Sequence, residues 1–128
     1  MGKTFDYLYT VKASDLDHLN HVNNVVYVQW VQDAAEKHWL TLTNEHNVSD
    51  YVWVVIRHEI DYLRQAFLGD ELAIKTWVGQ TEGSNSIRHV EVYKNNKIVC
   101  RAQTHWRLLS AKTFKPVHIP PEILNLFN

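Results

Sequence analysis

The sequence predicts an α+β fold in which one long helix packs against a mainly antiparallel sheet of about five strands. Three observations lead to this prediction. Apolar and polar residues alternate near the N-terminus, a single segment has the apolar spacing of an amphipathic helix, and the apolar runs after about residue 50 read as strands. Short turns separate these later runs, which is typical of antiparallel pairing.

Residues 5–11 are predicted to form the first strand, because bulky apolar side chains occupy every second position. This apolar face consists of Phe5, Tyr7, Tyr9 and Val11. Residues 14–24 follow without a clean period, and their side chains are mostly polar. We interpret this stretch as a loop rich in groups that can take part in chemistry.

A single amphipathic helix is expected to begin near Asn24, whose side chain can cap it by accepting a bond from an early backbone N–H group. Its apolar stripe follows i, i+3, i+4 spacing and consists of Tyr27, Trp30, Val31, Ala34, Ala35, His38 and Leu42. Polar residues take the opposite side. The helix is therefore expected to have four to five turns and a length of about 27 Å.

Four strands are predicted after residue 50, with turns at 69–70, 82–83 and 95–96. One face of the first of these strands is predicted to contain Val52, Val54, Ile56, His58, Ile60 and Tyr62, with Tyr51, Trp53 and Val55 on the other face. Residues 84–94 alternate poorly, whereas residues 98–108 alternate cleanly. Prolines 116, 120 and 121 then end the pattern, so the tail either crosses the sheet or frays.

Length and composition indicate one ordinary domain covering residues 1–128. Hydrophobic residues make up 45% of the chain and the net charge is -1, so disorder and general nucleic-acid binding are both disfavoured. Cys100 is the single cysteine, which excludes an internal disulfide and suits a reducing compartment. We find no signal core and no apolar run of membrane length, so we expect a cytoplasmic protein without a membrane partner.

The stretch from Ser14 to Tyr27 resembles the signature of acyl-CoA thioesterases of the 4-hydroxybenzoyl-CoA thioesterase type. The Asp15-x-Asp17 pair and the later Asn24 and Tyr27 carry this resemblance, and residues 21–24, His-Val-Asn-Asn, also resemble plant acyl-ACP thioesterases. The resemblance continues through residues 60–64, 68–72 and 119–120, and thus covers nearly the whole chain.

The resemblance implies a hotdog fold, in which an antiparallel sheet wraps around a central helix. It also implies an acyl-CoA substrate, hydrolysed to free acid and CoA, and a homodimer or homotetramer with active sites at subunit interfaces. Two positions depart from the family pattern. Leu19 stands where the plant enzymes carry an Asn, which counts against an acyl-ACP assignment, and Gln65 stands where related bacterial enzymes often have Pro.

Asp17 is the candidate catalytic residue. Its carboxylate can attack the thioester carbonyl and form a mixed anhydride, or it can take a proton from water. The N-terminus of the helix near Asn24 is a plausible site for the developing oxyanion, because free backbone N–H groups and the helix dipole favour negative charge there.

Each candidate also has a purely structural interpretation. Asp17 can be a turn or cap residue, and Asp15 is expected to bond loop N–H groups. The substrate or oxyanion candidates are His21, Asn23, Asn24, Tyr27 and His58. Among these, Asn23 is expected to order the loop, Tyr27 to pack in the core and His58 to be a satisfied core histidine, whereas His21 can orient substrate or bond the loop.

No metal and no cofactor are expected. His18 and His21 lie near Asp15 and Asp17, but this spacing matches neither an EF-hand nor a zinc motif. Cys100 lies on a regular apolar face and is expected to be inert, and no Gly-x-Ser-x-Gly elbow is present. Cations that could meet CoA phosphates are Arg57, Arg64, Lys75, Arg88 and Arg101.

Two rival functions remain open at this point. A hotdog protein can bind an acyl thioester without turnover, or act as a dehydratase, although the histidine setting of a dehydratase is not visible. Aromatic residues on the remaining strand faces, Tyr51, Trp53 and Trp77 with Val55, are expected to be covered by a second subunit. The alternative is that loops and the C-terminal tail cover them.

Overall fold

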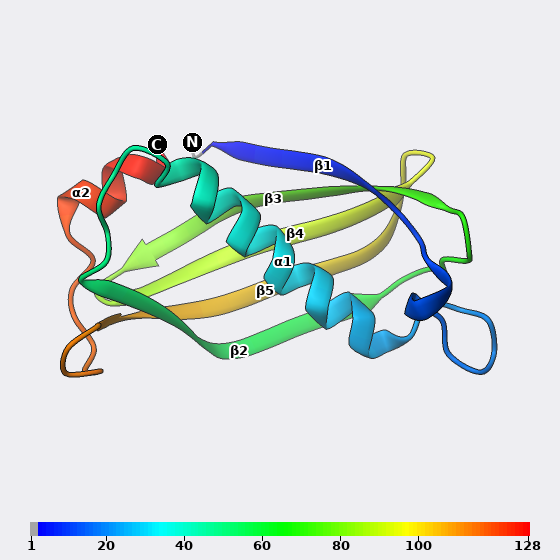
Figure 1. Ribbon diagram of the computed structural model, residues 1–128, viewed down its shortest axis with the longest axis horizontal. Helices are drawn as coiled ribbons and strands as arrows, with labels where there is room; N and C mark the ends of the chain where they lie inside the picture. Colours follow the sequence, from blue (N-terminus) through cyan, green and yellow to red (C-terminus); the bar gives the residue numbers. More distant parts are fainter. Residues whose placement is uncertain (1–2) are drawn as a thin grey trace.

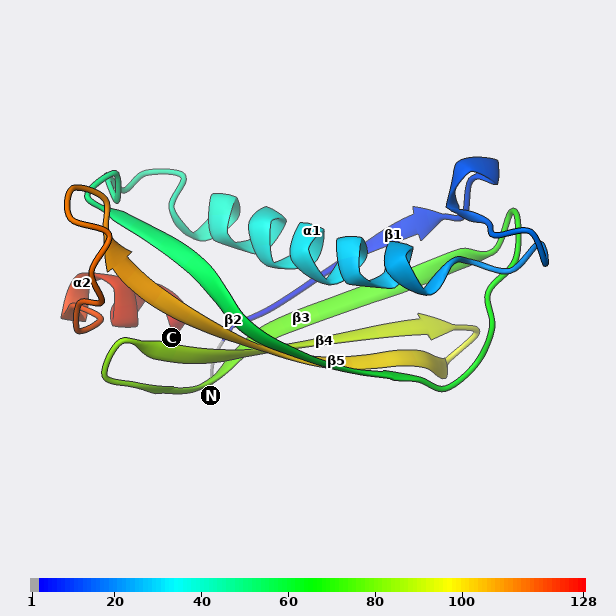
Figure 2. The ribbon, with the colours of Figure 1, turned by 90° about the horizontal axis from the view of Figure 1, so that it is seen from below.

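The long helix α1, Asn24–Leu42, lies across one face of the sheet in the computed structural model, which describes residues 3–128 (Figures 1 and 2). Its 19 residues extend about 28 Å at 1.5 Å per residue. All seven residues of the predicted apolar stripe are buried, namely Tyr27, Trp30, Val31, Ala34, Ala35, His38 and Leu42. The predicted helix and its buried face are therefore confirmed.

The helix cap is one residue earlier than the sequence suggested. Asn23, not Asn24, has the extended backbone of an N-cap, and its side chain accepts a hydrogen bond of 3.0 Å from the backbone N–H of Val25. Both positions hold asparagine, so composition alone could not distinguish them. The extended conformation of Asn23 decides the cap, because the capping residue must lie outside helical geometry.

Five strands form one antiparallel sheet in the order β1-β3-β4-β5-β2. Their bounds are β1 Thr4–Thr10, β2 Tyr51–Tyr62, β3 Glu71–Glu82, β4 Asn85–Lys94 and β5 Lys97–Ser110. Strands β1 and β2 occupy the two edges, and the sheet curves around α1 (Figure 2). This arrangement confirms the predicted α+β architecture of an antiparallel sheet wrapped around one helix.

The predicted turns are also present. Asn95 and Asn96 connect β4 to β5 with φ angles of 50° and 65°, the left-handed conformation that a two-residue hairpin turn requires. Gly83, with φ of 63°, lies between β3 and β4, and Gly69, with φ of 82°, precedes β3. These residue types tolerate positive φ with little steric cost.

A bulge in β2 overturns the predicted assignment of its faces. The register between β2 and β5 shifts between Val55 and Arg57, and Ile56, which is 49% exposed, is the extra residue. As a result, the inward face of β2 changes from odd-numbered residues before the bulge to even-numbered residues after it. The residues that pair with the inward face of β5 are Tyr51, Trp53, Val55, His58, Ile60 and Tyr62. A strict period of two cannot anticipate such a shift.

The inward face of β4 explains why apolar and polar residues alternate poorly in its sequence. Its inward face begins with Ser86 and Arg88 before continuing with Val90 and Val92, and all four are buried. Two polar residues on the buried face hide the strand period from a hydropathy pattern. The buried guanidinium of Arg88 also shows that it is not a surface cation available to CoA phosphates.

The C-terminal tail covers much of the aromatic surface that was expected to await a partner. Helix α2, Pro121–Leu124, and the short 3₁₀ helix η2, Asn125–Phe127, pack with Leu42 and Leu108 in a second core cluster. Tyr51 and Trp53 pack against this cluster, so their prediction as outward-facing residues is wrong. Trp77 belongs to the opposite side, where it stacks on His89. None of the helices in residues 3–128 is both long and apolar enough to span a membrane.

Candidate active site

Asp17 lies in a tight loop just before α1. The short 3₁₀ helix η1, Ala13–Asp15, leads into this loop, and a bridge between Leu16 and Val22 closes it. The Oδ1 atom of Asp17 accepts hydrogen bonds from the backbone N–H groups of Leu19, at 2.9 Å, and His21, at 3.2 Å. Asp17 therefore does hold a turn together, while within residues 3–128 no hydrogen bond engages its other carboxylate oxygen.

The loop favours the ionised form of Asp17. Desolvation raises the pKa of this carboxyl, but the N–H groups of Leu19 and His21, together with the nearby His18 and His21 rings, outweigh that effect and lower it. Asp17 is thus a carboxylate at neutral pH, held at one oxygen and available at the other. Such a group can act as a nucleophile or as a base.

Asp15 has the structural role expected of it. Its Oδ2 atom accepts hydrogen bonds from the hydroxyl of Tyr9, at 2.7 Å, and from the backbone N–H of Lys12, at 2.9 Å. Its backbone carbonyl also accepts a bond from the N–H of Asn23. Asp15 thereby ties the loop to β1 and to the start of α1, and leaves Asp17 as the carboxylate that faces outward.

The N-terminus of α1 offers fewer free donors than an uncapped helix. The side chain of Asn23 already occupies the N–H of Val25, and its carbonyl accepts the N–H of Val26. In the described part of the chain, the N–H of Asn24 has no such partner. The candidate oxyanion donors at this point are therefore the N–H and the exposed side-chain amide of Asn24.

The remaining candidates divide into two places. His21 lies at the loop, where its ring packs edge-on against Phe67 with 5.3 Å between ring centres. Tyr27 is buried in the core against Trp30, as the helix stripe indicated. His58 is on β2, where its Nδ1 contacts the Thr104 hydroxyl of β5 at 2.8 Å and its other ring nitrogen faces the amide of Gln32 on α1 at 3.4 Å. The structure therefore does not bring His58 to the Asp17 loop.

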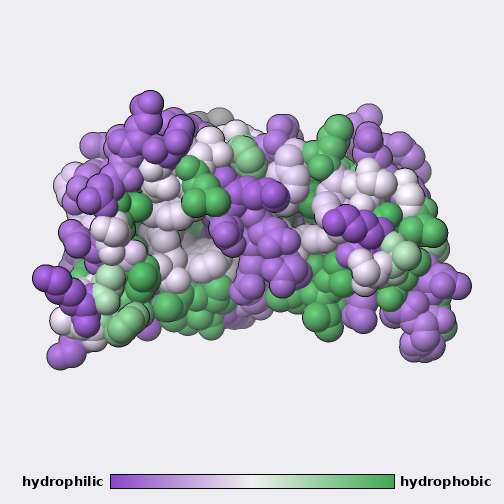
Figure 3. Space-filling model, in the orientation of Figure 1, coloured by the Kyte–Doolittle hydropathy of each residue, from purple (hydrophilic) through white to green (hydrophobic). Residues whose placement is uncertain are grey.

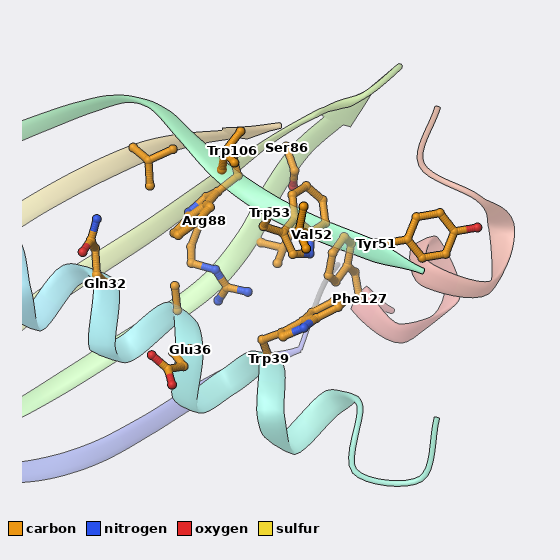
Figure 4. Close-up of a pocket in the computed structure, with 14 residues that line it drawn as sticks. Gln32, Glu36, Trp39, Tyr51, Val52, Trp53, Ser86, Arg88, Trp106 and Phe127 are labelled. Carbon is orange, nitrogen blue, oxygen red and sulfur yellow. The ribbon is translucent and has the colours of Figure 1, made fainter. Parts of the chain in front are cut away.

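A cavity of about 650 Å³ lies between the C-terminal half of α1 and the Tyr51 end of β2 (Figure 4). Its apolar lining consists of Ala35, Trp39, Tyr51, Val52, Trp53, Val54, Val55, Val78, Trp106 and Phe127, and its polar lining consists of Gln32, Glu36, Ser86 and Arg88. In the surface view, pale and green side chains gather along the side of the molecule where β2 runs (Figure 3). We name this cavity the helix pocket. Its size and apolar lining suit an acyl group.

Arg88 crosses the interior from β4 toward α1, and its guanidinium is directed into the helix pocket (Figure 4). Its Nη1 atom donates to Nδ1 of His38, at 2.9 Å, and to the hydroxyl of Thr76, at 3.1 Å. Desolvation lowers the pKa of Arg88 to about 10, so it stays charged at neutral pH. Desolvation, Arg88 and Lys3 lower the pKa of His38 to about 4, so His38 is a neutral acceptor.

The only sequence signal that could have identified Arg88 is its position on a strand face that is otherwise largely apolar. It interrupts the apolar face of a strand, which is the place where a charged residue is costly. The other candidate cations have no comparable setting; Arg57 and Arg101, for example, are largely exposed. Among residues 3–128 no group of three His, Cys, Asp or Glu side chains is arranged to hold a metal ion. Cys100 is buried, and desolvation followed by Asp61 raises its pKa to about 12, which leaves it a protonated thiol.

The loop that holds Asp17 precedes the N-terminus of α1, whereas the helix pocket lies along the middle and C-terminal part of this helix. The loop ends at Asn23, whereas the helix contributes residues 32–39 to the pocket. At 1.5 Å per residue, the pocket-lining residues Gln32 and Trp39 are about 12 Å and about 22 Å along the axis from Asn24. To reach this pocket within one chain, the acyl group of a thioester beside Asp17 would have to extend about 12 Å or more along α1.

Comparison with protein families gives one match that covers most of the chain. The model of the thioesterase-like superfamily matches residues 11–127. Among curated proteins, the long-chain acyl-CoA thioesterase FadM of Escherichia coli strain K12 is 27% identical over 123 residues, which cover 88% of this chain and 89% of FadM. A chloroplastic dodecanoyl-[acyl-carrier-protein] hydrolase of Cinnamomum camphora is also 27% identical over 123 residues, covering 92% of this chain.

The plant relatives are much longer than this chain, which spans only 18–30% of the length of those it matches. Among solved structures, Slr0204, a 1,4-dihydroxy-2-naphthoyl-CoA thioesterase from Synechocystis, superposes with a TM-score of 0.82 at 24% identity. That superposition covers 97% of this chain and 95% of Slr0204. The likeness shows that the two chains share a fold.

Proposed function

Because this chain belongs to the thioesterase-like superfamily, we propose that it hydrolyses an acyl-CoA thioester to a free acid and CoA, with Asp17 as the reacting carboxylate. The observation that carries the proposal is the geometry of Asp17. Backbone N–H groups fix one of its oxygens and hold it ionised, while the other oxygen has no protein partner within residues 3–128. FadM, the relative of similar length, is a long-chain acyl-CoA thioesterase.

Two routes are open to this carboxylate. In the first, the free Asp17 oxygen attacks the thioester carbonyl carbon, the C–S bond breaks, and CoA leaves as a thiolate; water then hydrolyses the mixed anhydride and regenerates the carboxylate. In the second, Asp17 takes a proton from water while that water attacks the carbonyl carbon. In both routes the leaving thiolate needs little acid assistance, since a simple thiol has a pKa of about 8.5.

The carbonyl oxygen gains negative charge in either route. The N–H of Asn24 and the positive end of the α1 dipole can stabilise this charge, and they come directly after the loop that holds Asp17. Asn23 keeps this helix end in place by capping Val25. Asn23 therefore positions the donors, and Asn24 supplies them.

We also propose a homodimer in which each active site uses two chains. Strand β2 is a sheet edge with apolar surface, and such edges favour pairing. The hydroxyl of Tyr62 donates a hydrogen bond to the carbonyl of Asn24, so the Tyr62 end of β2 lies beside the start of α1 and the loop that holds Asp17. The Tyr51 end of β2 borders the helix pocket. Antiparallel pairing of two β2 strands about a twofold axis would bring Asp17 of the partner subunit to the helix pocket.

A thiol-release assay with butyryl-, hexanoyl-, octanoyl-, decanoyl-, palmitoyl- and benzoyl-CoA tests the proposed activity. We expect release of CoA from at least one of these substrates without added metal or nucleotide, and unchanged rates in a chelator. Tight binding of these thioesters without turnover would indicate a binding protein instead. Faster hydrolysis of an acyl chain on acyl carrier protein than of the same chain on CoA would favour the activity named for the plant relatives.

A further inference from the structure

The guanidinium of Arg88 is a buried positive charge at the wall of the helix pocket. Arg88 is 6% exposed, and it lies on β4, two strands inside the β2 edge. With neighbouring strands about 4.8 Å apart, the Arg88 backbone lies about 10 Å from that edge. The side chain then continues toward α1, between the sheet and the helix (Figure 4).

Protein groups solvate this charge without neutralising it. Both hydrogen bonds come from Nη1 and go to neutral acceptors, the ring of His38 and the hydroxyl of Thr76. Across residues 3–128, no carboxylate lies within 4.0 Å of the guanidinium, and no hydrogen bond engages its Nε or Nη2. A buried unpaired charge is costly, so an anion that entered the pocket would gain an unusually strong partner.

The other polar groups of the pocket wall do not neutralise Arg88. The indole Nε1 of Trp106, a pocket-lining residue, is buried without a hydrogen-bond partner in the described part of the chain. Glu36 is the acidic residue of the lining; its side chain is exposed and makes no ion pair with Arg88. Because Nε1 of Trp106 has almost no accessible surface, it does not face the open cavity. Arg88 is thus the one cation among the pocket-lining residues of the described part of the chain, and the lining carboxylate leaves it unpaired.

We propose that the preferred substrate carries a second carboxylate at the end of its acyl group, and that Arg88 binds this carboxylate through Nε and Nη2. The aromatic and aliphatic pocket walls would enclose the methylene or ring portion between the two carbonyl carbons. This inference rests on the proposed thioesterase function, and it assigns Arg88 to substrate specificity. The thioester would remain at the mouth, beside Asp17 of the partner subunit.

Matched pairs of CoA thioesters test the inference in the wild-type protein. The pairs are succinyl with butyryl, adipoyl with hexanoyl, suberoyl with octanoyl and 4-carboxybenzoyl with benzoyl. In at least one pair the carboxylated member should have a kcat/KM at least tenfold higher. If every unsubstituted member is the better substrate, the inference is wrong while the thioesterase function stands.

Arg88→Met then separates charge from packing, since methionine keeps much of the side-chain length. The variant should lose at least 30-fold in kcat/KM for the best carboxylated substrate and keep or gain activity on its unsubstituted match. Arg88→Lys should retain part of the preference, and Lys97→Met, at an exposed position of β5, should retain all of it. Equal losses on both members of a pair would mean that Arg88 is only structural. Should Arg88→Met fail to fold, the wild-type preference decides the matter.

Affinity can be measured without turnover. Trp39 and Trp53 line the pocket, so tryptophan fluorescence can follow titration of Asp17→Asn protein with adipoyl- and hexanoyl-CoA. At least tenfold tighter binding of the adipoyl thioester is expected. Equal or weaker binding would overturn the inference, and this holds even if no CoA thioester is hydrolysed and the proposed function fails.

Discussion

The two ends of α1 contrast in almost every physical property. At its N-terminus, the loop that holds Asp17 is polar and partly exposed, and backbone N–H groups organise it. At its C-terminal half, the helix pocket is apolar and aromatic, with one buried charge that neutral side chains solvate. The first end can supply a reactive group, and the second can enclose a substrate.

This contrast supports the dimer that we propose. A reacting carboxylate must be accessible to water and to the thioester, whereas the acyl group of the substrate binds best in an apolar enclosure. In one chain these two requirements are met about 12 to 22 Å apart along α1. Pairing of the β2 edges is the arrangement we propose to join them.

The largest effect is expected from removing the reactive group. Asp17→Asn keeps the size of the side chain and an acceptor for the N–H groups of Leu19 and His21, but removes the nucleophile or base. We expect kcat to fall by about 100-fold or more while the fold is retained. Thiol-release kinetics and a thermal melt measure both properties. Near-normal turnover by a folded variant would remove Asp17 from the mechanism.

Mixed dimers test whether the two ends cooperate across subunits. Asp17→Asn protein lacks the reactive group, and Val55→Trp should obstruct the β2 side of the helix pocket. Each variant alone should be inactive, but mixing them after mild unfolding and refolding should restore about a quarter of wild-type activity, since half of the dimers would contain one intact site. No recovery, with mixed dimers confirmed by native mass spectrometry, would place both parts of the site in one chain.

At the pocket end of α1, titration of His38 should make the free energy of unfolding depend on pH. Desolvation and Arg88 lower its pKa to about 4 in the folded state, against an ordinary value of about 6.5. Below about pH 6.5 the unfolded chain therefore binds a proton that the folded chain does not. The stabilisation is present above this pH and is lost as pH falls toward 4, by up to about 3 kcal/mol.

Urea denaturation at about pH 7 and about pH 4.5 measures this loss. His38→Asn keeps an acceptor near the position of Nδ1 but does not titrate in this range, so it should lose less stability between the two values. If both proteins lose the same amount, other groups account for the acid sensitivity. His105→Asn, at a surface ion pair with Glu59, is a matched control at an exposed histidine.

The smallest effect is expected at the helix cap. Asn23→Ala removes the acceptor of the Val25 N–H and should lower the free energy of unfolding by about 1 kcal/mol. Because the cap also positions Asn24, a modest fall in kcat should accompany this loss. Asn24→Ala should leave stability nearly unchanged, so the pair distinguishes the cap from the residue after it. Equal destabilisation by both substitutions would contradict the assignment of the cap.

Sequence patterns predicted those features that depend on local periodicity and local chemistry. The spacing of Tyr27 to Leu42 gave the helix and its buried face, and the two asparagines at 95 and 96 gave the hairpin turn. The residues from Ser14 to Tyr27 also predicted the family, which the match over residues 11–127 confirms. The role of Asp17 stays a prediction, although its position in a bonded loop beside a helix N-terminus agrees with it.

Other features depend on contacts between distant segments. The bulge at Ile56 changed which side chains of β2 face inward, and the tail after Pro120 covered Tyr51 and Trp53. His58 was grouped with the loop candidates, yet it contacts Thr104, which is 46 residues away in the sequence. Neither the alternation of apolar residues along a strand nor a short motif indicates which strands become neighbours in the sheet.

By itself, therefore, the sequence determined the long helix, the five strands, their turns and the loop that holds Asp17, because hydrophobic periodicity, positive-φ turn residues and a capped helix start act over a few residues. Only the tertiary structure decided the strand order, the edge position of β2 and the burial of Arg88 at the helix pocket. Whether a charged side chain on β4 meets solvent or a pocket depends on the bend of the sheet and the packing of α1 above it. These properties arise from the sum of non-local contacts, which no short stretch of sequence contains.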